Sequence, residues 1–223
     1  FLKDTISDIS HQLKTPLSAL TIYNEIIASD AENKETVLAF TQKTQTALDR
    51  IEGLIQALLK VTRLDAGAVA FEKQAWLLAD VVGRAVSELL VRAEEEGKKI
   101  FLTGEENTYI NCDLQWTSEA IGNLVKNALD YTEQSAEITV SWNQSPETTR
   151  IAVSDNGKGI DEKDIHHIFK RFYRTSKRKG NGQRQGIGLG LPMARSIIES
   201  QGGTLSVQST KGEGTNFTIT LPK

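Results

Sequence analysis

Two runs of apolar residues with helical spacing occupy most of the first 61 residues. In the first run the apolar or semi-apolar positions are separated alternately by four and three residues, at Leu2, Ile6, Ile9, Leu13, Pro16, Leu20, Tyr23 and Ile27. After the polar stretch SDAEN at 29–33, the same spacing returns at Val37, Phe40, Thr44, Ala47, Ile51, Leu54, Leu58 and Val61, with Leu38, Leu48, Ile55 and Leu59 on a neighbouring stripe. This is the heptad pattern of packed helices. We therefore predict two long antiparallel helices joined by a short turn.

A hairpin of two such helices has more apolar surface than it can bury by itself. Each predicted helix is about 42 Å long, at roughly 1.5 Å per residue. Pairing of two hairpins into a dimeric four-helix bundle would cover the remaining surface. The alternative is a hairpin packed against the rest of the chain, which the periodicity alone leaves open.

The pattern changes after residue 65. We interpret 66–75 as a linker and 76–223 as a second domain in which short strands alternate with helices. Helices are expected at about 80–95, 113–130 and 192–201, and strands near Ile100 and Tyr109 and in the runs EITVSWN, RIAVSDN, TLSVQST and TNFTITL. The predicted fold is thus a helical hairpin, residues 1–65, followed by an α/β sandwich.

Composition excludes several classes of protein. The formal net charge of −3 gives no general attraction to nucleic acid or to anionic lipid. The single cysteine, Cys112, cannot form an intramolecular disulfide and is expected to serve in packing. No apolar run approaches the ~20 residues that cross a bilayer, so we expect a soluble, cytoplasmic fragment. Phe1 already lies within the helical pattern, which favours a fragment whose upstream region is missing. Any attachment to a membrane is expected to be through that region.

His11 is the first candidate for a residue with a chemical role. In SDISHQLKTPLSAL it falls on the outer side of the heptad pattern, so its ring is expected to be exposed. Taken alone, an exposed histidine is usually an ordinary polar surface residue. Thr15 lies one turn later on the same face, however, and Pro16 removes a backbone N–H inside a long helix, which is otherwise unfavourable.

The segment HQLKTPL resembles the H box of sensor histidine kinases. The resemblance implies that His11 accepts a phosphoryl group and that Thr15 helps to orient water when the partner protein is dephosphorylated. Gln12 departs from the family pattern, in which an acidic residue usually follows the histidine and stabilises positive charge on the ring.

Asn123 and Asn127 stand four apart in EAIGNLVKNALDYT and share one face of a predicted helix. Taken alone the pair is weak evidence, because capping or a buried polar bridge explains it equally well. It is similar to the N box of the same family, which implies that Asn127 is a Mg²⁺ ligand and that Asn123 lies near the phosphates of ATP. Tyr131 fits the box, whereas Asp130 stands where relatives often have lysine.

The run IAVS is followed by DNGKGI, a strand end with residues that favour a turn. This resembles the first glycine box of the family. The resemblance implies that Asp155 accepts a hydrogen bond from the adenine amino group, while Gly157 and Gly159 let the backbone approach the base.

Two further segments resemble the F box and the second glycine box. They are IFKRFYR, which includes Phe172 and Arg174, and GIGLGL, with Gly186, Gly188 and Gly190. Between Asp164 and Glu199 there is no acidic residue, while basic residues accumulate at Lys170, Arg171, Arg174, Lys177, Arg178, Lys179 and Arg184. We interpret 177–185 as a lid over the triphosphate, with Lys177 in contact with it and Arg174 near the phosphates or the phosphoacceptor. His166 and His167 match no motif and are predicted to be surface residues.

The order of these motifs implies an ATP- and Mg²⁺-dependent histidine kinase. It would act as a homodimer, phosphorylate His11 and pass the phosphoryl group to an aspartate of a response-regulator receiver domain, which docks near Ala19, Ile22 and Tyr23. No nucleic acid is expected as a partner. Two alternatives are an ATPase of the gyrase or chaperone kind, which the asparagine at 123 opposes, and a non-catalytic nucleotide-binding scaffold, which only Gln12 favours.

Overall fold

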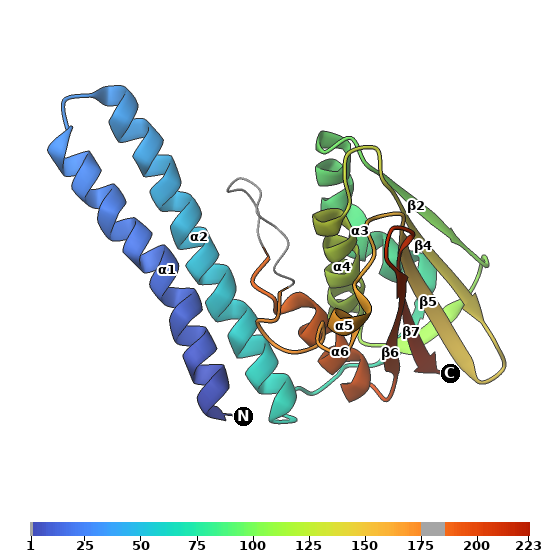
Figure 1. The fold of residues 1–223 in the computed structure, drawn as a ribbon. Helices are drawn as coiled ribbons and strands as arrows, with labels where there is room; N and C mark the ends of the chain where they lie inside the picture. The colour runs from blue at the N-terminus through green and yellow to red at the C-terminus, as the bar shows by residue number, and fades with distance from the viewer. Residues whose placement is uncertain (1, 175–185) are drawn as a thin grey trace. The chain divides into compact units, whose positions relative to one another are not determined.

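A computed structural model describes residues 2–174 and 186–223 of the chain, with side chains from residue 7 onward (Figure 1). The chain divides into two compact units, Phe1–Lys60 and Val61–Lys223. Among the described residues, none of the helices has the length and the hydropathy needed to cross a membrane.

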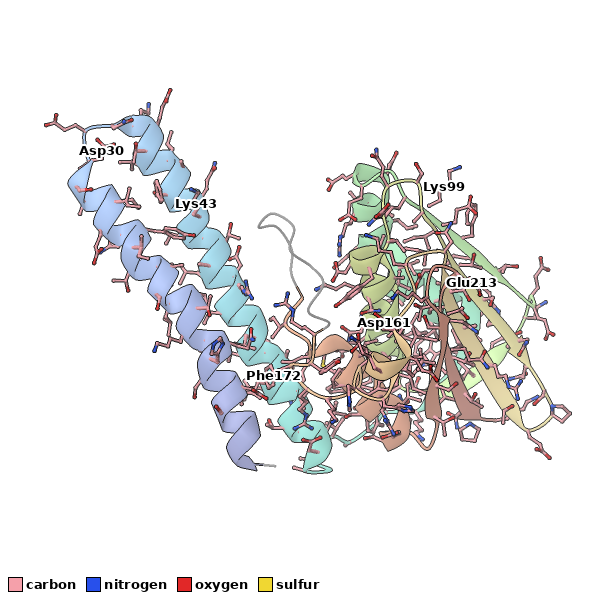
Figure 2. All side chains as sticks on the ribbon, in the orientation of Figure 1. Asp30, Lys43, Lys99, Asp161, Phe172 and Glu213 are labelled. Carbon is pink, nitrogen blue, oxygen red and sulfur yellow. The ribbon has the colours of Figure 1, made fainter. Side chains whose placement is uncertain are left out.

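The first unit is an antiparallel pair of helices, as the heptad spacing predicts. Helix α1 spans Leu2–Ser29 and helix α2 spans Lys34–Asp65. The turn between them contains Asp30, labelled in Figure 2. The side chain of Asn33 accepts hydrogen bonds from the backbone N–H groups of Glu35 and Thr36, at 3.2 and 3.3 Å. These bonds satisfy two of the free N–H groups at the start of α2.

Burial in the hairpin follows the two predicted seams. The seam residues between Ile9 and Leu58 are buried or half-buried, and the rings of Tyr23 and Phe40 pack across the two helices with centroids 5.6 Å apart. The neighbouring stripe on α2 is different, because its four side chains remain 45–55% exposed: Leu38, Leu48, Ile55 and Leu59. Each hairpin thus buries one apolar stripe and leaves a second one uncovered.

The second unit contains a five-stranded sheet in the order β2-β4-β5-β7-β6 and a two-stranded sheet, β1-β3. The strands are β1 (Gln74–Leu77), β2 (Lys99–Gly104), β3 (Tyr109–Cys112), β4 (Glu137–Gln144), β5 (Thr148–Asp155), β6 (Thr204–Thr210) and β7 (Gly214–Pro222). Strand β2 pairs with β4 in parallel, and the other pairs are antiparallel. The predicted strands are confirmed.

Three long helices cover one face of the larger sheet (Figure 1). They are α3 (Leu78–Glu95), α4 (Leu114–Tyr131) and α6 (Gly190–Ser200), and the short helix α5 (Glu162–Ile165) follows β5. The α/β sandwich inferred from the sequence is therefore confirmed, although α5 was not predicted. Alternating residues of the strands, such as Ile138 and Phe217, meet Ile121 and Leu124 of α4 in a core that excludes solvent.

The segment 66–75, interpreted from the sequence as a linker, lies in the second unit and packs on it. Phe71 contacts the hydrophobic core, and the ammonium group of Lys73 donates to the backbone carbonyl of Gln201 at 2.8 Å. Val61, in the last turns of α2, is fully buried in the same core. The boundary between the compact units therefore falls before Val61, inside α2.

Two predictions about single residues have opposite outcomes. Cys112 is buried in the core, so its packing role is confirmed. His166 is exposed, but the prediction of a surface position for His167 is wrong. The ring of His167 packs 5.5 Å from that of Tyr173, and its Nδ1 atom is buried with no hydrogen-bond partner in the described part of the chain.

Candidate active site

The polar face of α4 forms one wall of the candidate nucleotide site. The helix begins after Asp113, whose carboxylate accepts a hydrogen bond from the N–H of Trp116 at 3.0 Å, as expected for an N-cap. The opposite face of α4 is apolar and buried. Asn123 and Asn127 are half-buried on the polar face, four residues apart and hence neighbours.

The two asparagines differ in their hydrogen bonds. The amide nitrogen of Asn123 donates to the carbonyl of Glu119 at 3.0 Å. The Oδ1 atom of Asn123 faces Gly190, and a Cβ added at Gly190 would lie only 3.1 Å from that oxygen. Within residues 2–174 and 186–223 the side chain of Asn127 forms no hydrogen bond. Its amide oxygen is therefore available to a ligand.

The first glycine box joins the end of β5 to the end of α4. Asp155 is the last residue of β5, and its Oδ1 atom accepts a hydrogen bond from the N–H of Gly157 at 2.9 Å. An added Cβ at Gly157 would lie 2.7 Å from that oxygen and 3.0 Å from Thr132. Gly159 has a positive φ of 64° and passes so close to the Thr210 carbonyl that a side chain has no room. These close approaches fix the carboxylate beside the C-terminal end of α4.

Burial raises the pKa of the Asp155 carboxyl above its usual range. Hydrogen bonds from the backbone N–H groups of Gly157 and Thr215 oppose this effect but do not cancel it. A carboxylate that is costly to bury and has few partners is well suited to accept a hydrogen bond from an entering ligand.

The second glycine box lies along the polar face of α4. Gly190 is beside Asn123, and an added Cβ at Gly186 would lie 3.5 Å from the Oδ2 atom of Asp130. Residues 186–190 therefore run next to the helix that carries Asn127, and they lead into the N-terminus of α6. Free N–H groups at a helix N-terminus favour phosphate groups.

Phe172, labelled in Figure 2, connects the F box to this segment. Its N–H donates to the carbonyl of Gly188 at 2.9 Å. Both residues have positive φ, 59° for Phe172 and 80° for Gly188, and an added Cβ at Gly188 would lie 3.0 Å from the Phe172 backbone. Glycine at 188 is thus required for the contact.

The remaining predicted nucleotide contacts lie at the edges of this region. Tyr131 ends α4 and is 44% exposed, and Arg174 is half-buried at the end of the described segment. In the F box, Arg171 forms an ion pair with Asp65. Lys177 and the predicted lid, 177–185, lie outside the described residues.

The donor groups of the site fit magnesium better than a metal held by the protein alone. The described residues contain no group of three His, Cys, Asp or Glu side chains that could hold a metal ion. Mg²⁺ prefers oxygen ligands and usually combines one or two protein oxygens with phosphates and water. The unpaired amide oxygen of Asn127, on the helix that the second glycine box runs beside, matches that requirement.

The H box lies in the first unit, on α1. His11 is exposed, as its heptad position predicts, and Gln12 is half-buried beside it. The hydroxyl of Thr15 donates to the backbone carbonyl of His11 at 3.3 Å, while Pro16 is buried in the hairpin seam. The imidazole ring of His11 is therefore open to solvent, while the backbone carbonyl of the same residue is bonded to the Thr15 hydroxyl.

Sequence reasoning missed a set of charged residues that surrounds the end of α4. Arg92 of α3 pairs with Asp130 at 2.6 Å and with Glu96 at 2.7 Å, and Glu96 pairs with Lys98 at 2.7 Å. The spacing of Arg92 and Glu96 indicates only an ordinary helix pair. No local signal connects Arg92 to Asp130, 38 positions later.

Comparison with family models identifies both units. Residues 1–67 match the His Kinase A (phospho-acceptor) domain, and residues 112–223, half of the chain, match the histidine kinase-, DNA gyrase B-, and HSP90-like ATPase family.

Two known sensor proteins and two solved histidine kinase structures are similar to this chain. The sensor histidine kinase WalK of Bacillus subtilis strain 168 is 29% identical over 99% of this chain and 36% of its own length, and the sensor protein SrrB of Staphylococcus aureus strain N315 is 30% identical over 99% and 38%. The chain thus spans little more than a third of these relatives. Among solved structures, the histidine kinase ThkA in complex with the response regulator protein TrrA matches with a TM-score of 0.80 (18% identity, 100% of this chain, 62% of that one). The histidine kinase AdeS of Acinetobacter baumannii matches with a TM-score of 0.76 (18% identity, 95% and 97%).

The raised pKa of Asp155 leads to a prediction about both stability and binding. A carboxyl whose pKa is higher in the folded state destabilises the fold while it is ionised, and the penalty disappears as the pH falls through the folded-state pKa. Asp155→Asn keeps an oxygen for the Gly157 N–H and removes the charge. The variant should therefore unfold at a higher temperature than the wild type at about pH 8, with the difference shrinking toward about pH 4.

The same variant should bind ATP about tenfold or more weakly, because the amide turns donors toward the adenine amino group. Affinity for inorganic triphosphate, which lacks the base, should change little. Calorimetric titration with both ligands checks this, and an equal loss for both would contradict an adenine contact at Asp155.

Proposed function

The chain belongs to the sensor histidine kinases of two-component systems, and we propose that it transfers the γ-phosphoryl group of ATP to His11. The observation that carries the proposal is the polar face of α4. There the amide oxygen of Asn127, the glycine segment 186–190 and the Asp155 carboxylate border one region, while an exposed histidine lies on a separate helical unit.

The nucleotide site would bind the adenine and the phosphates of ATP with different groups. Asp155 would accept a hydrogen bond from the adenine amino group, next to the backbone of Gly157 and Gly159. Segment 186–190 and the N-terminus of α6 would offer N–H groups to the phosphates, with Tyr131 and Phe172 at the edges. Asn127 would hold Mg²⁺, which when bound supplies positive charge to the phosphate oxygens, and Asn123 would lie nearby.

The acceptor chemistry requires an unhindered ring nitrogen. In the proposed step a ring nitrogen of His11 attacks the γ-phosphorus, a P–N bond forms, and the bond from that phosphorus to the bridging oxygen of ADP breaks. The ring gains positive charge and its other N–H becomes more acidic. Gln12 can accept a hydrogen bond from that N–H, but its amide brings no charge. Arg174 and Lys177 would offset negative charge on the transferring group.

The partner of the phosphorylated hairpin is proposed to be a response-regulator receiver domain. Phosphohistidine can donate its phosphoryl group to an aspartate carboxylate, with the P–N bond breaking as the acyl phosphate forms. The proposed docking surface is the part of α1 that follows His11 and includes Ala19, Ile22 and Tyr23. It supports docking because the apolar side chain of Ile22 is 53% exposed. ThkA, which has the same fold, was solved with such a protein. Thr15 is proposed to help with the reverse dephosphorylation.

Homodimerisation is proposed to cover the second apolar stripe of the hairpin. Leu38, Leu48, Ile55 and Leu59 are about half exposed in the single chain. Burial of such side chains is favourable by roughly 1.5 to 3 kcal/mol each when complete. Two hairpins that face one another would form a four-helix bundle.

Simple ATP hydrolysis is the alternative enzyme function, and Asn123 argues against it. In relatives of the gyrase and chaperone kind a glutamate at this position activates water. An amide cannot accept a proton from water as a carboxylate does. Here the amide nitrogen of Asn123 is also engaged with the Glu119 carbonyl.

The direct test is His11→Ala, with His166→Ala as the matched control because His166 is exposed and outside every motif. Incubation with γ-labelled ATP should label the wild type and the control at an acid-labile site and leave His11→Ala unlabelled. ATP affinity should be unchanged in all three, since acceptor and nucleotide site lie in different units. Acid-labile label on His11→Ala would reject His11 as the acceptor.

The dimer is tested by replacing the exposed stripe. The wild type should sediment as a dimer at micromolar concentration, whereas Leu48→Glu/Ile55→Glu should sediment as a monomer because two charges would face the bundle interior. Glu52→Gln, an exposed position between them, should leave the dimer intact. A wild-type monomer would exclude the bundle.

Gln12→Glu should raise the rate of autophosphorylation about tenfold or more at neutral pH, with little change in ATP affinity. A carboxylate can stabilise the charged ring and take up its proton, and such assistance contributes roughly 10²-fold or more in other enzymes, with less expected at an exposed site. Single-turnover phosphorylation measures the rate. Gln42→Glu, the same change on α2, is the control, and an unchanged or lower rate in Gln12→Glu would mean that Gln12 is not the limiting group.

A further inference from the structure

Asp130 places a negative charge where the proposed nucleotide site needs positive charge. It lies three residues after Asn127 on α4, and its side chain is largely buried. The family pattern often has lysine at this position, which would attract phosphate groups. The aspartate therefore reverses the sign of a charge beside the site.

One oxygen of Asp130 is held in a network of charged side chains. Its Oδ1 atom accepts a hydrogen bond from Arg92 at 2.6 Å, and Arg92 also contacts Glu96 at 2.7 Å. Lys98 completes the network through Glu96 at 2.7 Å and through the backbone carbonyl of Leu129 at 2.5 Å. With two acids and two bases the network is neutral, and it fixes the position of the carboxylate at the end of α4.

The other oxygen faces the second glycine box. Oδ2 of Asp130 accepts no hydrogen bond in the part of the chain that the structure describes, and an added Cβ at Gly186 would approach it to 3.5 Å. Because Gly190 at the other end of this box lies next to Asn123, the glycine segment and the polar face of α4 form two neighbouring walls. The free oxygen of Asp130 belongs to the α4 wall and faces Gly186, three residues after the proposed metal ligand Asn127.

We propose that Asp130 lowers the affinity of the site for nucleotide that carries no divalent cation, an inference that rests on the proposed ATP site. A metal-free triphosphate would bring several negative charges close to the free oxygen of Asp130, and like charges that lie close together repel. Arg92 offsets part of the repulsion. With Mg²⁺ bound to the phosphates the added positive charge removes most of the remainder. The chain thus favours the magnesium complex of ATP over free ATP.

Measured affinities for ATP with saturating MgCl₂ and with EDTA test the proposal. Four proteins are compared by titration calorimetry: wild type, Asp130→Asn, Asp130→Ser and Glu95→Gln. The asparagine and serine variants both remove the charge and keep an acceptor for Arg92. Glu95→Gln removes one exposed carboxylate of α3 outside the network and controls for net charge. Thermal unfolding shows which variants are folded.

The expected result is an affinity for metal-free ATP that rises about threefold to tenfold in the folded Asp130 variants, with little change for ATP with magnesium. The control should behave as the wild type does. Unchanged metal-free affinity in a folded Asp130 variant would overturn the proposal, because Arg92 would then neutralise the carboxylate completely. Equal losses with and without metal would also overturn it and indicate a hydrogen bond to the sugar. A wild type that binds no adenine nucleotide in either condition would instead reject the proposed ATP site itself.

Discussion

The second unit depends on the burial of α4 between its neighbours. On one face of this helix Ile121, Leu124 and Leu129 are fully buried against the sheet and the flanking helices. The other face carries Asn123 and Asn127, which are only half-buried. Because the apolar face fixes the rotation of the helix, the asparagines cannot turn away from the second glycine box. The rigidity of the core thus determines the geometry of the candidate site.

The candidate acceptor, His11, and the candidate nucleotide site lie in different compact units, which has a chemical consequence. His11 is exposed on the first unit, so its ring is open both to a nucleotide and to a partner protein. In the candidate nucleotide site, the side chain of Asn127 forms no hydrogen bond with any described residue. The proposed phosphotransfer requires this division, whereas an enzyme that only hydrolyses ATP would not need it.

Local sequence predicted much of the fold, because local interactions determine those parts. The heptad spacing predicted both hairpin helices, the helix expected at about 113–130 corresponds to α4, and the turn after Asp155 was located by its glycines. The exposed second stripe could not be told from a buried one, since both have helical spacing. The contact of Arg92 with Asp130 depends on how α3 packs along α4, which side-chain shape over the whole interface decides. For the same reason the heptad spacing does not reveal that Val61, near the end of α2, is buried in the core of the second unit.

The central claim is that the phosphoryl group of ATP goes to the protein and not to water. Phosphorus NMR of the wild-type protein with ATP and magnesium, combined with mass spectrometry of the peptide that contains His11, tests it most directly. The account predicts a phosphorus signal bonded to nitrogen on His11, one of the three histidines of the chain, matched by an equal amount of ADP. Steady accumulation of inorganic phosphate, with no phosphorus bound to the protein at any time, would contradict it.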